Sequence, residues 1–140
     1  MRSMDRAHLR IAVIDDDESV RKALQRLLRA EQMDARTFAS GQEFLCSLGS
    51  VWPDCVILDV HMPGINGLDV QRRLAEDGLR LPVVIITGYD EPQTRARCMS
   101  TGAAAYLRKP LEAKGLLSAI DQAVGLQHRQ GLPEGNAERP

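Results

Sequence analysis

Polar residues that could carry chemistry stand after four short apolar runs of the chain. They are an acidic triplet, a single aspartate, a threonine and a lysine followed by a proline: Asp15-Asp16-Asp17, Asp59, Thr87 and Lys109-Pro110. Carboxylates that converge on one spot repel one another, so such a cluster persists only if a cation binds there or some acids stay protonated. These residue types therefore point to a cation site.

An oxygen-only, carboxylate-rich site suits Mg²⁺, with Mn²⁺ as the second candidate. Both ions keep several waters and commonly take a phosphate oxygen as a further ligand. A lysine ammonium and a threonine hydroxyl beside the ion would donate hydrogen bonds to the remaining phosphoryl oxygens. The chemistry that this set of residues serves is phosphoryl transfer.

The candidate residues meet only if the apolar runs form neighbouring strands. The runs alternate with segments of helical period, which is typical of repeated βα units and a parallel sheet. Expected strands cover 11–14, 35–38, 55–58, 83–86 and 104–107; expected helices lie near 20–28, 67–75, 90–102 and 116–124, and another opens at Ser40. Such apolar strands are covered on both faces and place a functional crevice beyond their carboxyl ends. The expected fold class is a doubly wound α/β sandwich.

Composition places the chain among single globular domains. It has 140 residues, 44% of them hydrophobic and 26% charged, with a formal net charge of −1. That charge gives no overall field to recruit nucleic acid or an acidic membrane surface. The expected organisation is an N-terminal extension over 1–8, one domain over 9–127 and a disordered tail over 128–140. With neither a signal peptide's apolar stretch nor a membrane-spanning run in this sequence, we expect a cytoplasmic protein.

Two local features give further expectations. The three cysteines, Cys46, Cys55 and Cys98, fit neither a disulfide framework nor a zinc site, so we expect buried or half-buried thiols that act as small apolar groups. The stretch Asp90-Glu91-Pro92-Gln93 predicts a helix start with Asp90 as the N-cap and Pro92 in the first turn.

Four stretches, VIDDDESVRKAL, VILDVHMPGINGLDV, VVIITGYDE and GAAAYLRKP, resemble in order the motifs of response-regulator receiver domains of two-component signal transduction. The resemblance covers about Leu9 to Leu126. It implies a flavodoxin-like (βα)5 sandwich whose five parallel strands lie in the order 2-1-3-4-5. It also implies a phosphoacceptor signalling domain that catalyses only its own phosphorylation and dephosphorylation.

The resemblance assigns roles to individual residues. Asp59 would accept a phosphoryl group from a sensor histidine kinase or a histidine phosphotransfer protein. Four groups would hold Mg²⁺: the carboxylates of Asp15, Asp16 and Asp59 and the backbone carbonyl of His61. Thr87 and Lys109 would contact the phosphoryl group, Tyr106 would report the active state with Thr87, and Pro110 would follow a cis peptide bond. The third acid, Asp17, is expected to cap a helix instead of binding the metal.

Two residues are expected to tune the lifetime of the signal. In the family, the positions two residues after the acceptor and two after the hydroxyl flank the path of the hydrolytic water, and here they hold His61 and Tyr89. Their large rings predict slow self-dephosphorylation by obstruction of in-line attack. The contrary interpretation is that His61 orients or deprotonates the water and speeds hydrolysis.

Other interpretations of these residues compete with the assignments above. The acidic triplet could be a solvated helix start, Thr87 a turn residue and Tyr106 a core aromatic. A haloacid-dehalogenase-type phosphatase needs an acid two residues after its nucleophile, where this chain has His61. A flavodoxin-like FMN protein needs phosphate donors in its first loop, where this chain has three carboxylates. A receiver that is not phosphorylated is the remaining alternative.

The domain context of the receiver has two interpretations. The Pro- and Glu-containing tail favours a stand-alone receiver, and the alternative is the receiver half of a DNA-binding transcriptional regulator. A homodimer through the fourth helix, fifth strand and fifth helix is a further expectation. We expect no direct contact of this domain with nucleic acid or membrane.

Overall fold

The structure, a computed structural model, describes residues 6–50 and 52–131. Strands and helices alternate along the chain: β1 (Arg10–Ile14), α1 (Glu18–Ala30), β2 (Asp34–Phe38), α2 (Gly41–Ser47), β3 (Cys55–Asp59), α3 (Gly67–Glu76), β4 (Val83–Thr87), α4 (Pro92–Ser100), β5 (Ala105–Arg108) and α5 (Ala113–Gly131). No helix in this described part is both long and apolar enough to cross a membrane.

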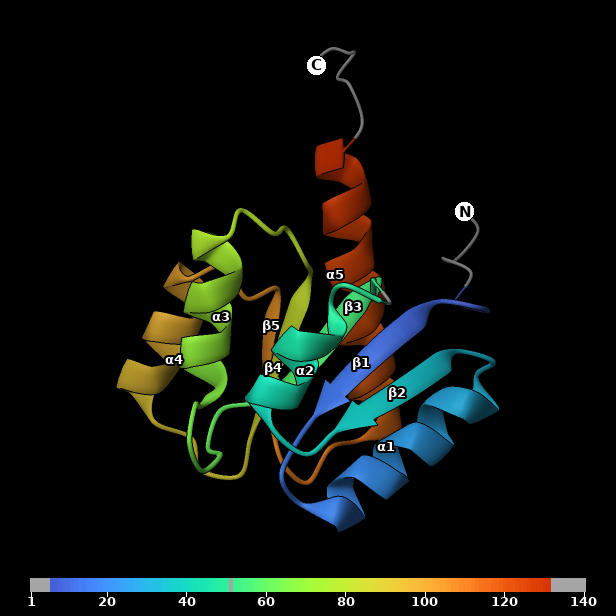
Figure 1. Cartoon of the computed structure of the whole chain (residues 1–140). Coiled ribbons are helices and arrows are strands. Elements are labelled where there is room, and N and C mark those ends of the chain that lie inside the picture. Colours follow the sequence, from blue (N-terminus) through green and yellow to red (C-terminus); the bar gives the residue numbers. More distant parts are fainter. Residues whose placement is uncertain (1–5, 51, 132–140) are drawn as a thin grey trace.

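The five strands form one parallel sheet in the order β2-β1-β3-β4-β5. Helices α1 and α5 cover one face, and α2, α3 and α4 cover the other (Figure 1). This arrangement confirms the expected doubly wound fold and strand order. All carboxyl strand ends point to the same edge, which is the lower edge of the sheet in Figure 1.

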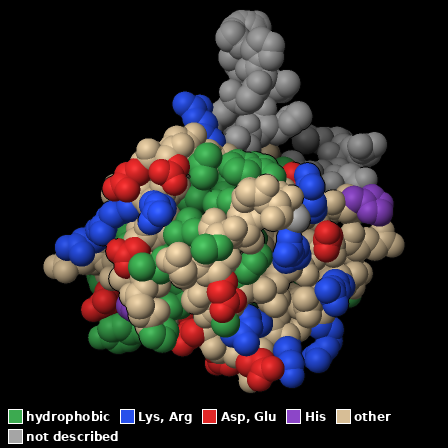
Figure 2. Space-filling view, in the orientation of Figure 1, with side chains coloured by type: hydrophobic (Ala, Val, Ile, Leu, Met, Phe, Trp, Pro, Cys, Tyr) green, Lys and Arg blue, Asp and Glu red, His purple; other side chains and the backbone are tan. Residues whose placement is uncertain are grey.

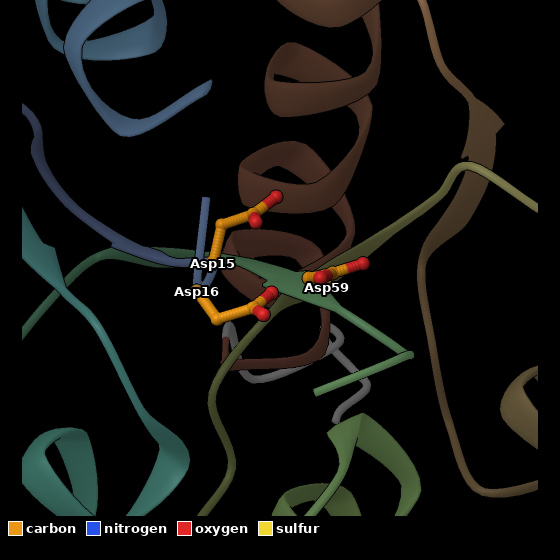
Figure 3. Close-up of side chains that lie close together, drawn as sticks. All are labelled: Asp15, Asp16 and Asp59. Carbon is orange, nitrogen blue, oxygen red and sulfur yellow. The ribbon is translucent and has the colours of Figure 1, made fainter. Parts of the chain in front are cut away.

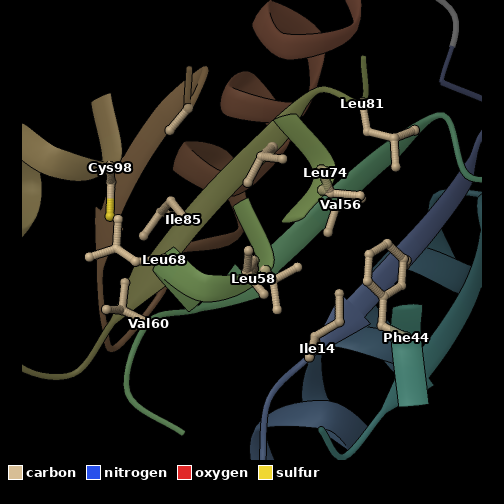
Figure 4. Close-up of a cluster of buried hydrophobic side chains, with 14 of the residues drawn as sticks. Ile14, Phe44, Val56, Leu58, Val60, Leu68, Leu74, Leu81, Ile85 and Cys98 are labelled. Atoms are coloured by element: carbon tan, nitrogen blue, oxygen red, sulfur yellow. The ribbon is translucent and has the colours of Figure 1, made fainter. Parts of the chain in front are cut away.

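The core consists of two apolar clusters separated by the sheet. Successive side chains of a strand point to opposite faces, so Ile14, Leu58 and Ile85 pack under α2, α3 and α4 (Figure 4). Val13 and Ile57 instead pack under α1 and α5. On the face shown in Figure 2, hydrophobic side chains gather near the middle, with basic and acidic side chains mixed around them.

Side-chain caps define where three helices begin. Asp17 caps α1 by accepting a hydrogen bond from the Ser19 amide at 2.8 Å, which confirms its expected capping role. Ser40 caps α2 by accepting from the Glu43 amide, and Asn66 caps α3 in a capping box. The cap prediction for α4 is wrong: its N-cap is Glu91, not Asp90, because the residue before a proline is driven into an extended conformation.

The end of α5 also differs from the expectation. The helix continues to Gly131, four residues beyond the predicted domain end at Gln127. Glutamine and arginine tolerate helix well, so the stretch after Leu126 can prolong α5 even though the apolar pattern has ended. The rest of the predicted disordered tail, 132–140, and residues 1–5 of the predicted extension lie outside the described residues.

The cysteine prediction holds for two of the three thiols. Cys55 and Cys98 are buried, and burial raises the pKa of Cys55 to about 12 and that of Cys98 above its usual value. Cys46 is exposed, contrary to the expectation. It lies on the outer side of the short helix α2, which buries Gly41 and Phe44 instead.

Candidate functional site

Three carboxylates converge at the carboxyl edge of the sheet. Asp15 and Asp16 follow β1, and Asp59 is the last residue of the neighbouring strand β3. Figure 3 shows their side chains around one small space. One oxygen from each carboxylate lies within 4.8 Å of the others. Asp15 and Asp59 are buried, whereas Asp16 is exposed, so the cluster has one side open to solvent.

The donor set of this cluster fits a hard divalent cation. All three side chains are carboxylates that offer oxygen ligands, and those of Asp15 and Asp59 have almost no access to water. Mg²⁺ prefers oxygen ligands and retains waters, which the open side at Asp16 would accommodate. Of the four groups that the resemblance assigned to the metal, the three carboxylates are thus brought together.

Lys109 is the cation that the chain itself supplies. Its Nζ lies 2.8 Å from Asp15 Oδ2 and 3.5 Å from Asp59 Oδ1. Burial disfavours the charged ammonium, but the hydrogen bond to Asp15 and the charges of Asp59 and Asp15 outweigh it, so the pKa of Lys109 is raised. Lys109 is therefore protonated at neutral pH. The peptide bond between Lys109 and Pro110 is cis, as expected.

Asp59 lies in an environment that opposes its charge. Burial and the neighbouring Asp15 carboxylate raise its pKa from 3.8 to about 6, and Lys109 partly offsets both effects. At neutral pH most of the population is still the carboxylate, which is the nucleophilic form. Asp59 thus combines ionisation with very little solvent access.

Backbone contacts position the acidic residues. Asp15 accepts the Asp17 amide on its side chain, and its own carbonyl accepts from Arg21 Nη1 at 2.8 Å. The Gly67 amide donates to the Val60 carbonyl, and a Cβ on Gly67 would lie 2.6 Å from the Asp59 carbonyl oxygen. The contact from Arg21 was not anticipated, because it joins a helix residue to a loop six positions earlier.

Thr87 is buried at the end of β4, one residue after Ile86, which pairs with Asp59 in the sheet. Its hydroxyl donates to the Tyr89 carbonyl at 2.9 Å and accepts from the Tyr89 amide at 3.0 Å. His61 Nε2 lies 3.4 Å from the same carbonyl, and the His61 and Tyr89 rings are 6.2 Å apart. His61 and Tyr89, which the resemblance places beside the path of the hydrolytic water, are neighbours on exposed loops.

Tyr106 lies on β5, on the same sheet face as Ile85 and α4. Its ring is buried, Arg95 of α4 stacks over it at 5.4 Å, and its hydroxyl meets no partner in hydrogen-bond geometry. Burial, together with the nearby Asp90, raises the pKa of the phenol. The ring is therefore inward in this structure, packed between β5 and α4.

Comparison with known proteins agrees with this fold. The family model described as response regulator receiver domain matches residues 11–121. The chain therefore belongs to the receiver domains of response regulators. It is 38% identical to the transcriptional regulatory protein TdiR of Thauera aromatica over 129 residues, which are 92% of this chain and 57% of that protein.

One further curated relative and one solved structure are also similar to this chain. The response regulator protein TmoT of Ectopseudomonas mendocina is 36% identical over 126 residues, covering 89% of this chain and 57% of the relative. The chain thus spans a little over half the length of these curated relatives. A response regulator receiver protein from Burkholderia phymatum has a crystal structure that is 46% identical, with a TM-score of 0.75, covering 84% of this chain and 95% of that one.

Proposed function

We propose that Asp59 accepts a phosphoryl group from a phosphohistidine of a sensor histidine kinase or a histidine phosphotransfer protein. One observation carries the proposal: the strand-end carboxylate of Asp59 lies 3.5 Å from the Lys109 ammonium and shares a small space with Asp15 and Asp16. The two buried carboxylates repel each other at this distance, and a divalent cation together with a phosphoryl group would relieve that repulsion.

The transfer exchanges one bond for another. A carboxylate oxygen of Asp59 attacks phosphorus in line with the leaving nitrogen, so a P–O bond forms as the P–N bond of the donor breaks. The imidazole of the donor leaves with the electron pair of that bond. Asp59 becomes an acyl phosphate, and no other reactant is consumed.

The remaining residues stabilise the charge on the transferring group. Lys109 donates to one phosphoryl oxygen and Thr87 to another once its hydroxyl proton is free. Mg²⁺, held by Asp15, Asp16, Asp59 and the His61 carbonyl, would supply charge neutralisation at the phosphoryl oxygens.

Intact-mass spectrometry tests the acceptor. After treatment with acetyl phosphate and Mg²⁺, the parent should gain one phosphoryl unit and Asp59→Asn none. Asp34→Asn is the matched control, because Asp34 is exposed at the opposite end of the sheet, and it should be modified as the parent is. Phosphoryl incorporation that survives in Asp59→Asn would remove the proposal.

The same reaction tests the metal. Chelation by EDTA should abolish incorporation, and Asp16→Ala should weaken Mg²⁺ binding, measured by titration calorimetry on the unphosphorylated protein. Asp16 is exposed, so its removal leaves the buried packing intact and isolates the ligand role. Unchanged Mg²⁺ affinity in Asp16→Ala would show that the metal assignment is wrong.

A second candidate function concerns what the receiver controls. The relative TdiR is named a transcriptional regulatory protein, and the chain matches 57% of its length. This favours the alternative in which the receiver regulates a DNA-binding output domain, in place of acting alone or through a homodimer at α4, β5 and α5. Sequencing the locus beyond Pro140 tests it: an open frame that continues into a DNA-binding domain supports this candidate, and an immediate stop codon contradicts it.

A further inference from the structure

The hydroxyl of Thr87 is already engaged. It donates its proton to the Tyr89 carbonyl at 2.9 Å and accepts from the Tyr89 amide at 3.0 Å. A hydroxyl has a single proton to donate, although it can accept from more than one partner. If a phosphoryl group on Asp59 accepts a hydrogen bond from this hydroxyl, the Tyr89 carbonyl loses its donor.

A second group is in reach of that carbonyl. His61 Nε2 lies 3.4 Å from the same oxygen. Because a carbonyl oxygen only accepts, this contact is a hydrogen bond when Nε2 carries the proton. At 3.4 Å the bond is long and weak while Thr87 occupies the carbonyl, and a small movement of the loop would shorten it.

We propose that His61 is a positioning residue that replaces Thr87 as hydrogen-bond donor to the Tyr89 carbonyl when Thr87 turns to the phosphoryl group. The proposal rests on phosphorylation of Asp59. It gives the His61 side chain a role distinct from shielding or activating water: it keeps the loop from Gly88 to Asp90 ordered after its internal hydrogen bond is broken. Asp90 also pairs with Arg108 of β5 at 3.9 Å, so order in this loop extends to the strand that carries Tyr106.

Two substitutions separate the hydrogen bond from ring packing. His61→Phe keeps an aromatic ring beside Tyr89 and loses the donor, whereas His61→Gln loses the ring and keeps an N–H donor. The affinity for beryllium fluoride with saturating Mg²⁺, measured by ¹⁹F NMR, reports the cost of forming the loaded state. One hydrogen bond corresponds to a roughly threefold to tenfold change in affinity. We expect that loss in His61→Phe and an affinity within about twofold of the parent in His61→Gln.

The alternatives give opposite results. If water satisfies the Tyr89 carbonyl, His61→Phe binds as tightly as the parent and the proposal fails. If both variants are equally weak, bulk or packing at position 61 is the cause and the proposal fails again. In Tyr89→Ala, which keeps the carbonyl and removes the ring, the effect of His61→Phe should persist, and its disappearance would assign the effect to ring contact.

An arm without any ligand separates this proposal from the acceptor function. In Thr87→Val the donor is removed genetically, so adding His61→Phe should speed amide hydrogen exchange at Tyr89 and Asp90 by roughly threefold to tenfold. In the parent background the same substitution should have a much smaller effect. Equal effects in the two backgrounds overturn the proposal. Failure of the parent to bind beryllium fluoride would instead count against phosphorylation of Asp59 and leave this arm to decide the role of His61.

Discussion

Asp59 carries a negative charge where burial and the Asp15 carboxylate both oppose it. Lys109 offsets part of this cost through its contacts with both acids. The repulsion between these buried carboxylates therefore lowers the stability of the fold at a site that serves function. A cation or a phosphoryl group with its metal would relieve the same repulsion.

A pH dependence follows from the raised pKa of Asp59. The folded state binds this proton with a pKa of about 6, against 3.8 for the ordinary carboxyl group, so ionised Asp59 destabilises the fold above that range. Asp59→Asn should be more stable than the parent by roughly 1–3 kcal/mol at about pH 7.5 in metal-free buffer. The difference should narrow as pH falls from about 7 to about 4, where folded Asp59 takes up its proton. Urea unfolding at several pH values measures it, and a difference independent of pH would contradict the prediction.

A second prediction about individual side chains concerns the lifetime of the acyl phosphate. The His61 and Tyr89 rings lie 6.2 Å apart, on the loops that follow Asp59 and Thr87. If the Tyr89 ring obstructs the hydrolytic water, Tyr89→Ala should speed loss of the phosphoryl group, by roughly threefold or more. Decay of the phosphorylated protein, followed by Phos-tag electrophoresis, gives the rate. An unchanged rate would exclude shielding by Tyr89, and slower decay in His61→Asn would show that His61 promotes hydrolysis.

Sequence reasoning located the acidic residues, Thr87 and Lys109 because each follows a strand, and parallel strands end at one edge. It did not find the contact of Arg21 with the Asp15 carbonyl or that of Arg95 with the Tyr106 ring. Both contacts join a helix side chain to another element, so they depend on how helices pack. It also could not show that the Thr87 hydroxyl bonds to the carbonyl and the amide of Tyr89, because backbone groups of a turn leave no signal in the residue types.

Helix α3 approaches the end of β3 closely because of one glycine. A Cβ on Gly67 would lie 2.6 Å from the Asp59 carbonyl oxygen and 2.9 Å from Val60 Cα, and both neighbours are backbone atoms that cannot rotate away. The close approach of α3 to the end of β3 thus depends on the absence of a side chain at Gly67, the first residue of α3. The motif carries a glycine here for packing, and the packing fixes the backbone of the acceptor.

Gly67→Ala should therefore destabilise the protein by roughly 2 kcal/mol or more, and slow phosphorylation as the Asp59 backbone shifts. Gly115→Ala is the matched control: Gly115 lies in α5 with open space around its Cβ position, and alanine there should stabilise the protein by roughly 0.5–1 kcal/mol. Chemical denaturation of both variants measures the two effects. A Gly67→Ala variant as stable as the parent would show that the connection adjusts at no cost.

The element ends show where local sequence stops being sufficient. Strand and helix positions followed from apolar periodicity, and the caps at Asp17 and Ser40 from their side chains. The start of α4 was misplaced by one residue because the preference of a cap residue competed with the constraint that Pro92 places on Glu91. The end of α5 was misplaced because helix can continue past its buried face when its residues are good helix formers.

Across the whole molecule, we expect the site to act on the surface of α4, β5 and α5. Thr87, Asp90 and Arg95 lie on β4, the following loop and α4, and they lead from the acceptor edge to Tyr106 and Arg108 of β5. The response that we expect is a change in the contact of Tyr106 with Arg95 and in the Asp90–Arg108 pair. Such a change would bias the surface of α4, β5 and α5 towards a partner or a second receiver.

NMR spectra of the parent with Mg²⁺ and beryllium fluoride test this long-range response. Amide shifts should change at Arg95, Tyr106 and Arg108 as well as around Asp59, and light scattering should show whether a dimer forms. Arg95→Gln removes the cation over the Tyr106 ring and should reduce the shift changes on β5 while leaving those at Asp59. Shift changes confined to the loop after Asp59 would count against a signal that leaves through β5.

The side-chain alternation of the sheet has a consequence for how such a domain can diverge. Asp59 aligns with Ile86 and so faces the α1 and α5 layer, whereas Thr87, one residue later on β4, faces the α4 layer with Ile85 and Tyr106. The proposed acceptor and the proposed switch residue Tyr106 therefore lie on opposite faces of the sheet. Mutations beneath α1 therefore leave the packing around Tyr106 unaltered, whereas mutations in α5 bear on both the layer that holds Asp59 and the surface of α4, β5 and α5.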